Sequence, residues 1–284
     1  QLADLGNVYD DGALSNRNLI INGAMQVAQR GSSGSFSSNT SRGFILDRWY
    51  GEGYPLNVTI QQSTINYDGL TYDSSSISSI TGAYAYYQGI EDGYKITKGK
   101  TLTLSFVASG SGTIQTKTWI ATVNEQTFGS SITLTSTPTK YTITHTISNS
   151  GTGDDLYIGL SGSGGSMNVS LVQLEVGDTA TPFEHKNVGQ EILACQRYFY
   201  KYPDSGDYSH PLDHSSGFRS QFVTFPVIMR ANPTLSNVTG AGNYTPANPD
   251  SSGGMVHGAY FQWNSVSSSG FVRVESGFKA DAEL

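Results

Sequence analysis

The chain has 284 residues and a formal net charge of −7, and only 14% of its residues are charged, against roughly 25% in an average soluble protein. It has no cluster of Lys and Arg, which excludes the basic patch that binds nucleic acid or an anionic membrane surface. The single cysteine, Cys195, excludes an intrachain disulfide, and no run reaches the roughly 18 apolar residues of a membrane span. We therefore expect no nucleic-acid partner and no membrane insertion.

Alternating apolar residues in the middle of the chain predict β-strands with one buried face. The alternation occurs in KTLTLSFVASG, KYTITHTIS and DLYIGLSG, which Gly, Ser, Asn and Thr separate. The residues that share a face are Leu102, Leu104 and Phe106 in the first run, Tyr141, Ile143, His145 and Ile147 in the second, and Leu156, Ile158 and Leu160 in the third. We expect His145 to be a hydrogen-bonded residue of the core or its rim.

The run MNVSLVQLEVG changes phase in its middle. Its apolar residues are Met167, Val169 and Leu171 on one parity and Val172, Leu174 and Val176 on the other. The change predicts a β-bulge near Leu171 and Val172, because one extra residue returns the later side chains to the original face.

One segment, NVGQEILACQRYFYKYP, has the spacing of a helix. Apolar residues four, three and four apart lie on one helical stripe. They are Val188, Ile192, Cys195 and Phe199. We expect a connector helix across Val188 to Tyr202 that ends at Pro203. Shorter strand-like runs after it predict a second, smaller β unit from about Asp204.

A search for catalytic motifs is negative. The sequence has no GxSxG, GxGxxG, P-loop or HExxH motif. Adjacent carboxylates, as in Glu91-Asp92, point to opposite faces of a strand and do not converge as a glycosidase needs. Cys195, on the helical stripe, is better explained as a small buried hydrophobic residue than as a nucleophile. We therefore expect a protein that is not an enzyme.

Aromatic residues are abundant, with 17 Tyr, 12 Phe and 3 Trp dispersed among polar residues. Such rings suit the apolar faces of sugars, while nearby amides and hydroxyls suit their hydroxyl groups. Strands of a sandwich also favour aromatic residues for packing. We favour core and sheet packing for five of them, namely Trp49, Trp119, Tyr84, Tyr86 and Tyr87.

Three blocks of sequence together resemble a domain that is widespread in phage and prophage tail fibres. The first is NLIINGAMQVAQRG with the following FILDRWY, and the second is YAYYQGIEDGYKITKGKTLTLSFVASG. The third is VQLEVGDTATPFEHKNVGQEILACQRYFYKY. They cover roughly the first 200 residues, and three blocks in this order are far more specific than any one alone. The closing FVRVESGFKADAEL also resembles the end of such fibre proteins.

The resemblance implies an all-β fold: a jelly-roll β-sandwich similar to carbohydrate-binding modules, followed by a short connector helix and a smaller C-terminal β domain. We expect an N-terminal attachment segment over 1–15, the jelly roll over 16–186, the connector helix over 187–203 and the C-terminal β domain over 204–284. In the jelly roll, Asn18 to Gly31 is expected to form the first strand. Asp47 and Arg48 would orient the next strand through a charge-assisted hydrogen bond.

The resemblance also bears on metal binding. Some carbohydrate-binding jelly rolls hold a structural calcium ion where their first and last strands meet. Asn22 and Glu175 are the nearest candidates for such ligands, but the sequence lacks a clustered acidic loop. We therefore expect no cofactor, with a structural calcium ion as the alternative.

With no catalytic motif, the resemblance predicts a non-catalytic fibre protein of a phage virion that attaches the phage to a host-surface polysaccharide or lipopolysaccharide. Such fibres are usually homotrimers, and the N-terminus would contact other tail or fibre proteins of the virion. Two alternatives are a tailspike-like depolymerase of capsule or lipopolysaccharide, and a structural spacer or capsid decoration protein.

We expect the receptor site in the C-terminal β domain, because the far end of a fibre meets the cell first. Its candidate residues lie in turn-rich stretches that could present rings to a sugar. They are Tyr208, His210, Tyr244 and Trp263. The alternative for Trp263 is that it fills the core of this small domain.

Overall fold

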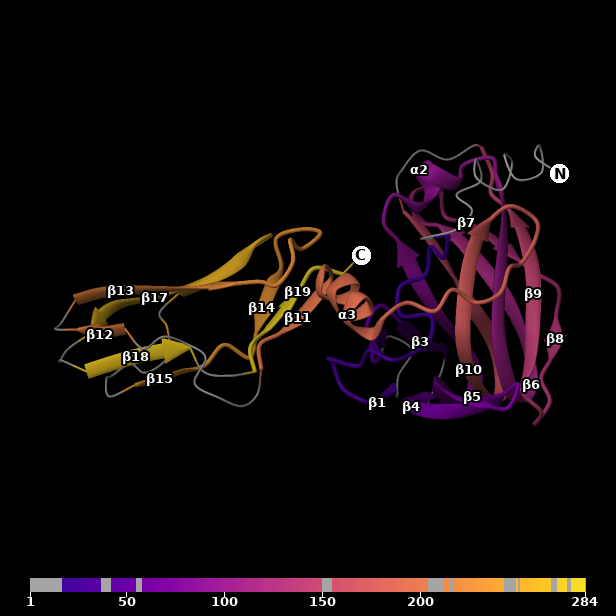
Figure 1. Ribbon diagram of the computed structural model, residues 1–284, viewed down its shortest axis with the longest axis horizontal. Helices are drawn as coiled ribbons and strands as arrows, with labels where there is room; N and C mark the ends of the chain where they lie inside the picture. Colours follow the sequence, from indigo (N-terminus) through magenta and orange to yellow (C-terminus); the bar gives the residue numbers. More distant parts are fainter. Residues whose placement is uncertain are drawn as a thin grey trace. The chain divides into compact units, whose positions relative to one another are not determined.

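The computed structural model describes residues 17–36, 42–54, 58–149, 155–203, 212–214, 217–242, 249, 251–266, 270–274 and 277–283. The chain divides into two compact units, unit 1 over 1–191 and unit 2 over 192–284. Strands build both units, which confirms the predicted all-β class (Figure 1). Among the described residues, no helix has the length and apolar character needed to cross a membrane.

Among its described residues, unit 1 contains a single curled sheet of ten strands. The strands are β1 (Ser33–Phe36), β2 (Arg42–Phe44), β3 (Tyr50–Tyr54), β4 (Val58–Tyr67), β5 (Leu70–Ile90), β6 (Thr101–Ile120), β7 (Glu125–Phe128), β8 (Ile132–Thr133), β9 (Thr139–Thr146) and β10 (Leu156–Val176). A short helix, α2 (Gly93–Thr97), follows β5, and a turn of 3-10 helix, η1 (Ala121–Val123), follows β6. The order along the sheet is β1-β4-β5-β10-β6-β7, with β3 beside β5, β2 beside β3, and β8 and β9 beside β6.

Three long strands run through both halves of this sheet, and β6 and β10 can be followed side by side in Figure 1. In half-sheet A, residues 83–90 of β5, 113–120 of β6 and 156–163 of β10 lie with β2, β3, β7 and β8. In half-sheet B, the other parts of the long strands lie with β1, β4 and β9. Apolar side chains of both halves join one core, so the curled sheet forms a β-sandwich.

Glycines allow the long strands to bend between the two halves. Gly112, Gly164 and Gly165 have φ of 87°, 73° and 80°, a conformation that glycine adopts without a steric penalty. At Gly110, a Cβ atom would lie 2.0 Å from the backbone oxygen of Ser166. The corner between the half-sheets therefore depends on residues without side chains.

The predicted β-bulge is confirmed. The pairing of β10 with β6 shifts register between Ser170 and Gln173, and Leu171 has a φ of 51°. Val169 and Val172 both face the main core, whereas Leu171 joins a separate small cluster with Val107. The bulge therefore turns one side chain out of the core and keeps the rest of the strand in phase.

The prediction that Asn18 to Gly31 forms the first strand is wrong. The segment 17–32 is irregular, and Asn22 and Met25 have φ of 57° and 58°, which interrupts an extended strand. It still lies against the last strand of unit 1, because Leu19 N donates to Leu174 O at 3.0 Å. Most of its other hydrogen bonds involve side chains, whereas a strand would make them through its backbone.

The side chains of Asn18 and Asn22 make many of these hydrogen bonds. The Asn18 Oδ1 atom accepts from the backbone N–H of Leu174 at 3.0 Å, while its Nδ2 atom donates to Val172 O at 3.2 Å. The Asn22 side chain accepts from Val27 N and donates to Val27 O, both at 2.9 Å. Two amide side chains thus replace a strand ladder.

The buried pair that precedes Trp49 also fixes this segment. The Asp47 carboxylate accepts from the backbone and the side-chain amide of Gln29, at 2.6 and 2.8 Å. The buried Arg48 guanidinium donates to the backbone oxygen of Gly89 in β5. The charge-assisted bonds predicted here are present, and they connect the segment and the sheet.

The predicted connector helix is shorter than expected. Helix α3 (Val188–Gln196) ends before Phe199, and β11 (Phe199–Lys201) begins at that residue and pairs with β19 (Lys279–Asp281). Cys195 is buried as predicted, but Val188 is exposed. The alternating aromatic residues after the helix form a strand because the C-terminal strand offers them backbone partners and a core.

Unit 2 consists of three three-stranded sheets among its described residues. The orders are β11-β19-β14, β12-β18-β15 and β13-β17-β16, with β12 (Leu212–His214), β13 (Gly217–Thr224), β14 (Thr234–Ser236), β15 (Gly240–Gly242), β16 (Ser251–Met255), β17 (Gly258–Val266) and β18 (Gly270–Val274). Its core contains Tyr200 and Tyr202, which precede the predicted start at Asp204. The second β unit therefore begins with β11.

Candidate functional site

One face of half-sheet A packs on the core, and the other carries half-buried aromatic side chains. In β5, Tyr84 and Tyr86 are 4% and 1% exposed and belong to the core. Tyr87 has the opposite parity, so its ring lies on the outer face. We call the five half-buried rings of this outer face the aromatic row. Its members are Phe44 of β2, Tyr50 of β3, Tyr87 of β5, Tyr157 of β10 and Trp119 of β6.

Strand register places these rings in contact. Phe44 is paired with Tyr50, Tyr50 with Tyr87, and Tyr157 with Trp119. The distances between ring centres along the row are 5.1 Å, 5.0 Å, 5.9 Å and 5.0 Å. All four lie in the range of favourable aromatic pairs, so the row is continuous across five strands.

The third contact, between Tyr87 and Tyr157, is a diagonal one. Tyr87 is paired with Gly159, and Tyr157 is paired with Gly89. Because each ring lies opposite a residue without a side chain, the two rings can meet edge to face, with an angle of 85° between their planes.

Polar and charged side chains surround the row. The Tyr87 hydroxyl donates to Glu52 at 3.2 Å, and Trp119 Nε1 donates to Asn124 Oδ1 at 3.3 Å. The Arg30 guanidinium lies 4.7 Å from the centre of the Phe44 ring. Partial burial lowers the pKa of Lys117, an effect that the negative charge of Glu52 opposes. The face therefore offers ring surface together with hydrogen-bond donors and acceptors.

This arrangement suits the binding of a hydroxyl-rich chain with apolar faces. Half-buried rings provide contact area at little entropic cost, because the sheet already fixes them. The surrounding carboxylate, amide and ammonium groups can orient hydroxyl groups. Five aromatic residues were predicted to pack in the core or on the sheet. Trp49, Tyr84 and Tyr86 are in the core, whereas Tyr87 and Trp119 pack against neighbouring rings on the outer face of the sheet.

Of the four residues predicted to bind a glycan, the structure places one. Tyr208, His210 and Tyr244 lie outside the described residues. Trp263 is 1% exposed and packs in the core of unit 2, so its ring presents no face to a sugar. Its assignment as a ligand residue is therefore corrected to the alternative, a core residue.

Asn22 and Glu175 do not fit a calcium site. The Glu175 carboxylate accepts from Thr181 N and Oγ1 at 3.0 and 2.5 Å, and from Gln173 Nε2 at 2.9 Å. The Asn22 oxygen is bonded to Val27 N. A calcium ion needs six to eight oxygen ligands, and the part of the chain that the structure describes has no group of three His, Cys, Asp or Glu residues that could hold a metal.

His145 has the environment that its alternation predicted. It is buried, and its Nε2 atom lies 2.8 Å from the Thr116 hydroxyl. Burial lowers the pKa of this imidazole, because the charged form loses solvation. His145 is a hydrogen-bonded core residue.

Comparison with known proteins gives only distant structural similarity. No family model and no curated protein matches the sequence. The enzymatically active domain of tailspike protein 4 from bacteriophage CBA120 matches with a TM-score of 0.40 and 16% identity. That match covers 58% of this chain and 22% of the tailspike chain.

Two other solved structures match in the same way. A putative sugar binding protein from Bacteroides thetaiotaomicron has a TM-score of 0.38 and 14% identity, over 56% of this chain and 100% of that one. The CBM22-1 and GH10 modules of xylanase 10B from Clostridium thermocellum, complexed with xylohexaose, have a TM-score of 0.36 and 10% identity, over 54% and 30%. At TM-scores this low, the similarity identifies neither a family nor a ligand.

Proposed function

We propose that the aromatic row binds a glycan and that unit 1 acts as a non-catalytic carbohydrate-binding module. The observation that carries this proposal is the continuous series of half-buried rings on the outer face of half-sheet A. A row of rings across five strands can contact several successive sugar units, each through its apolar face.

The polar neighbours support a sugar ligand over a purely apolar one. Glu52 and Lys117 lie beside the row, and Asn124 bonds the indole nitrogen of Trp119. An apolar ligand would remove water from such groups without replacing its hydrogen bonds, at a cost in free energy, whereas sugar hydroxyls can both donate and accept.

The wider role that we propose is attachment of a phage virion to a glycan of the host surface, either a polysaccharide or a lipopolysaccharide. The three sequence blocks that resemble tail-fibre domains support this role, because all three lie in or directly after unit 1. In this proposal the protein is an external fibre of the virion, and its N-terminal segment contacts other tail or fibre proteins.

The test measures binding of the full chain to an array of bacterial surface polysaccharides. Trp119→Ala should weaken binding to the recognised glycan about tenfold, because one stacked ring contributes on the order of 1–2 kcal/mol. Phe222→Ala, which removes an exposed ring of unit 2, is the matched control and should bind like the parent chain. Equal binding by all three proteins would contradict the role of the row.

Two further measurements separate the alternatives. New reducing ends after incubation with host polysaccharide would indicate a depolymerase instead of a binding protein. A complete lack of binding to host cells and to the array would favour a structural spacer or a capsid decoration protein.

A further inference from the structure

Half-sheet B has a pocket of about 500 Å³ on its outer face, within unit 1 and distinct from the aromatic row. Its floor contains the buried residues Val107 of β6 and Leu171 of β10. Leu171 reaches this face because the β-bulge turns it out of the main core. The size of the pocket suits a small ligand.

Aromatic side chains form the walls of the pocket. Tyr67 and Tyr72, from the hairpin of β4 and β5, are half-buried, and so is Phe183. The His185 imidazole stacks on Tyr72 with 6.0 Å between ring centres, and it meets the Phe183 ring edge to face at 4.9 Å. These rings give the pocket apolar surface that is already in place before a ligand binds.

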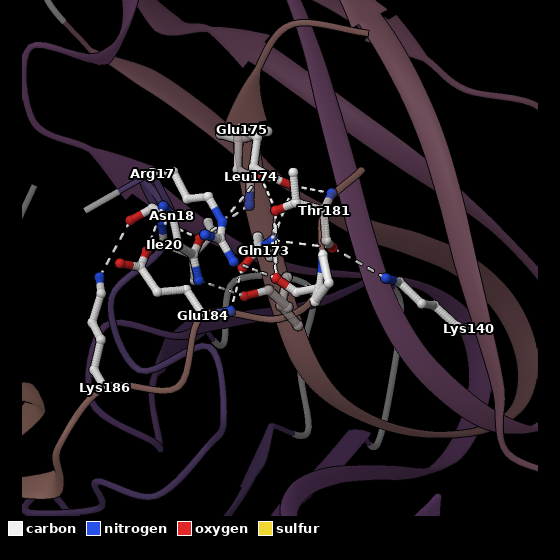
Figure 2. Close-up of polar contacts among 12 residues, drawn as sticks. Arg17, Asn18, Ile20, Lys140, Gln173, Leu174, Glu175, Thr181, Glu184 and Lys186 are labelled. Carbon is white, nitrogen blue, oxygen red and sulfur yellow. Dashed lines mark hydrogen bonds and ion pairs between the residues drawn. The ribbon is translucent and has the colours of Figure 1, made fainter. Parts of the chain in front are cut away.

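The wall that carries Phe183 and His185 belongs to the segment 178–187, which we call the strap. Figure 2 shows how polar contacts attach the strap to β10 and to the N-terminal segment. Glu175 accepts two hydrogen bonds from Thr181, and the Gln173 oxygen accepts from Glu184 N at 2.7 Å. The Glu184 carboxylate accepts from Asn18 N at 2.9 Å. Bonds at several points along the strap hold its rings in a fixed position.

Charged groups lie at the rim. The Lys140 ammonium donates to Thr181 O at 3.3 Å, a contact also visible in Figure 2, and this bond holds it at the pocket. An ammonium has three donors, so two remain for a ligand. Asp68, in the turn between β4 and β5, is exposed and supplies an acceptor.

The polar atoms of the pocket walls can also form hydrogen bonds with a ligand. Within the part of the chain that the structure describes, the Tyr67 and Tyr72 hydroxyls and the nitrogens of His185 have no hydrogen-bond partner in the protein. A pocket that combines fixed rings, unused hydroxyl and imidazole groups and a positioned ammonium favours a ligand with an apolar face, hydroxyls and a negative charge.

We propose that this pocket binds a single acidic sugar, with its carboxylate at Lys140 and its apolar face on the Tyr67 and Tyr72 rings. Asp68 accepts from the sugar hydroxyls on the exposed side. This second site is separate from the aromatic row, and it would select the charged units of an acidic glycan.

The test uses calorimetric titration of the full chain with two sugars, methyl β-D-glucuronide and methyl β-D-glucoside. The glucoside has a hydroxymethyl group where the glucuronide has its carboxylate, and the two are otherwise identical. The glucuronide should bind about tenfold or more tightly, because a charge-assisted hydrogen bond contributes roughly 1.5–3 kcal/mol. Lys140→Gln should abolish this preference, and Lys140→Arg should retain most of it. Tyr72→Ala should reduce the affinity for both sugars.

The controls separate this proposal from folding and from the aromatic row. Lys95→Gln removes an ammonium that is 66% exposed and remote in sequence from the pocket, and it should leave both affinities unchanged. Trp119→Ala impairs the aromatic row alone, so this variant should show the same preference for the glucuronide over the glucoside as the parent chain. No binding of either sugar, equal affinity for both, or an unchanged preference in Lys140→Gln would overturn the proposal.

Discussion

Gly23 lies where the N-terminal segment meets β10, and the absence of a side chain is what permits this contact. A Cβ atom at this position would lie 2.1 Å from Val172 O. That oxygen already accepts from Asn18 Nδ2 at 3.2 Å, and Val172 N donates to Gly23 O at 2.9 Å. The two segments are therefore held too closely for either to shift freely.

Gly23→Ala should lower the free energy of unfolding by about 1–3 kcal/mol, the usual cost of overpacking. Urea unfolding followed by circular dichroism measures the loss. Gly189→Ala is the control, because the nearest atom to its Cβ would be the side-chain oxygen of Asn187, at 3.1 Å, and that side chain can adjust. Equal midpoints for the two variants would show that the Gly23 contact is not restrictive.

His145 gives a prediction on pH. Its pKa in the folded protein is lowered by burial, whereas in the unfolded chain it stays near 6.5. The unfolded state therefore binds more protons as the pH falls below about 6.5, and the stability that the neutral imidazole provides above that pH is lost. The free energy of unfolding should decrease between pH 7 and pH 5, and it should decrease less in His145→Gln. An identical pH dependence in the two proteins would contradict this assignment.

At the scale of the elements, the corner between the half-sheets depends on adjacent glycines with different surroundings. Gly164 has open space around its would-be Cβ, whereas at Gly165 that atom would lie 2.2 Å from Ser111 O. Both have φ near +75°, at 73° and 80°.

The two alanine variants at this corner form a matched pair. Gly164→Ala should cost about 1–2 kcal/mol of unfolding free energy, the penalty for a left-handed residue. Gly165→Ala should cost clearly more, because it adds a clash with backbone to the same penalty. Denaturant titrations of both variants measure the difference, and equal losses would mean that the corner can widen without cost.

Sequence patterns predicted the strands in which the alternation of buried and exposed side chains is visible in the local sequence. The alternation in β6, β9 and β10 and the phase change at Leu171 follow directly from which side chains are buried. The segment 18–31 has apolar residues too, but its conformation is set by Asn18 and Asn22, whose bonds to distant backbone leave no periodic trace. The helix was predicted to be too long, because Phe199 to Lys201 pair with β19, a strand 80 residues later that the local sequence does not reveal.

The candidate site could be predicted less well than the fold. In β6, both faces near Trp119 carry polar residues, and Thr116 and Thr118 are buried, so parity alone does not show which face is exposed. The contact between Trp119 and Tyr157 depends on a register between strands that are far apart in sequence. Such a register comes from the folded sheet and not from either strand.

At the scale of the whole molecule, we predict a homotrimer, in which three copies of a weak glycan site gain avidity. Light scattering at micromolar concentration should give three times the 30.4 kDa mass of the chain. A mass of one chain would contradict the prediction. Loss of cell binding on dilution, without loss of binding to the isolated sugar, would support it independently.

The β-bulge at Leu171 has a consequence for how the gene can change. Deleting that one residue would remove the extra residue of the bulge, so Val169, Val172 and Leu174 would alternate without interruption and would all still face the core. Gln173 and Glu175 would keep the face on which they hold the strap, whereas the pocket floor would lose its leucine. A single-codon deletion there would preserve the alternation of the sandwich strand and remove the pocket floor, so the pocket requires the extra residue and the core does not.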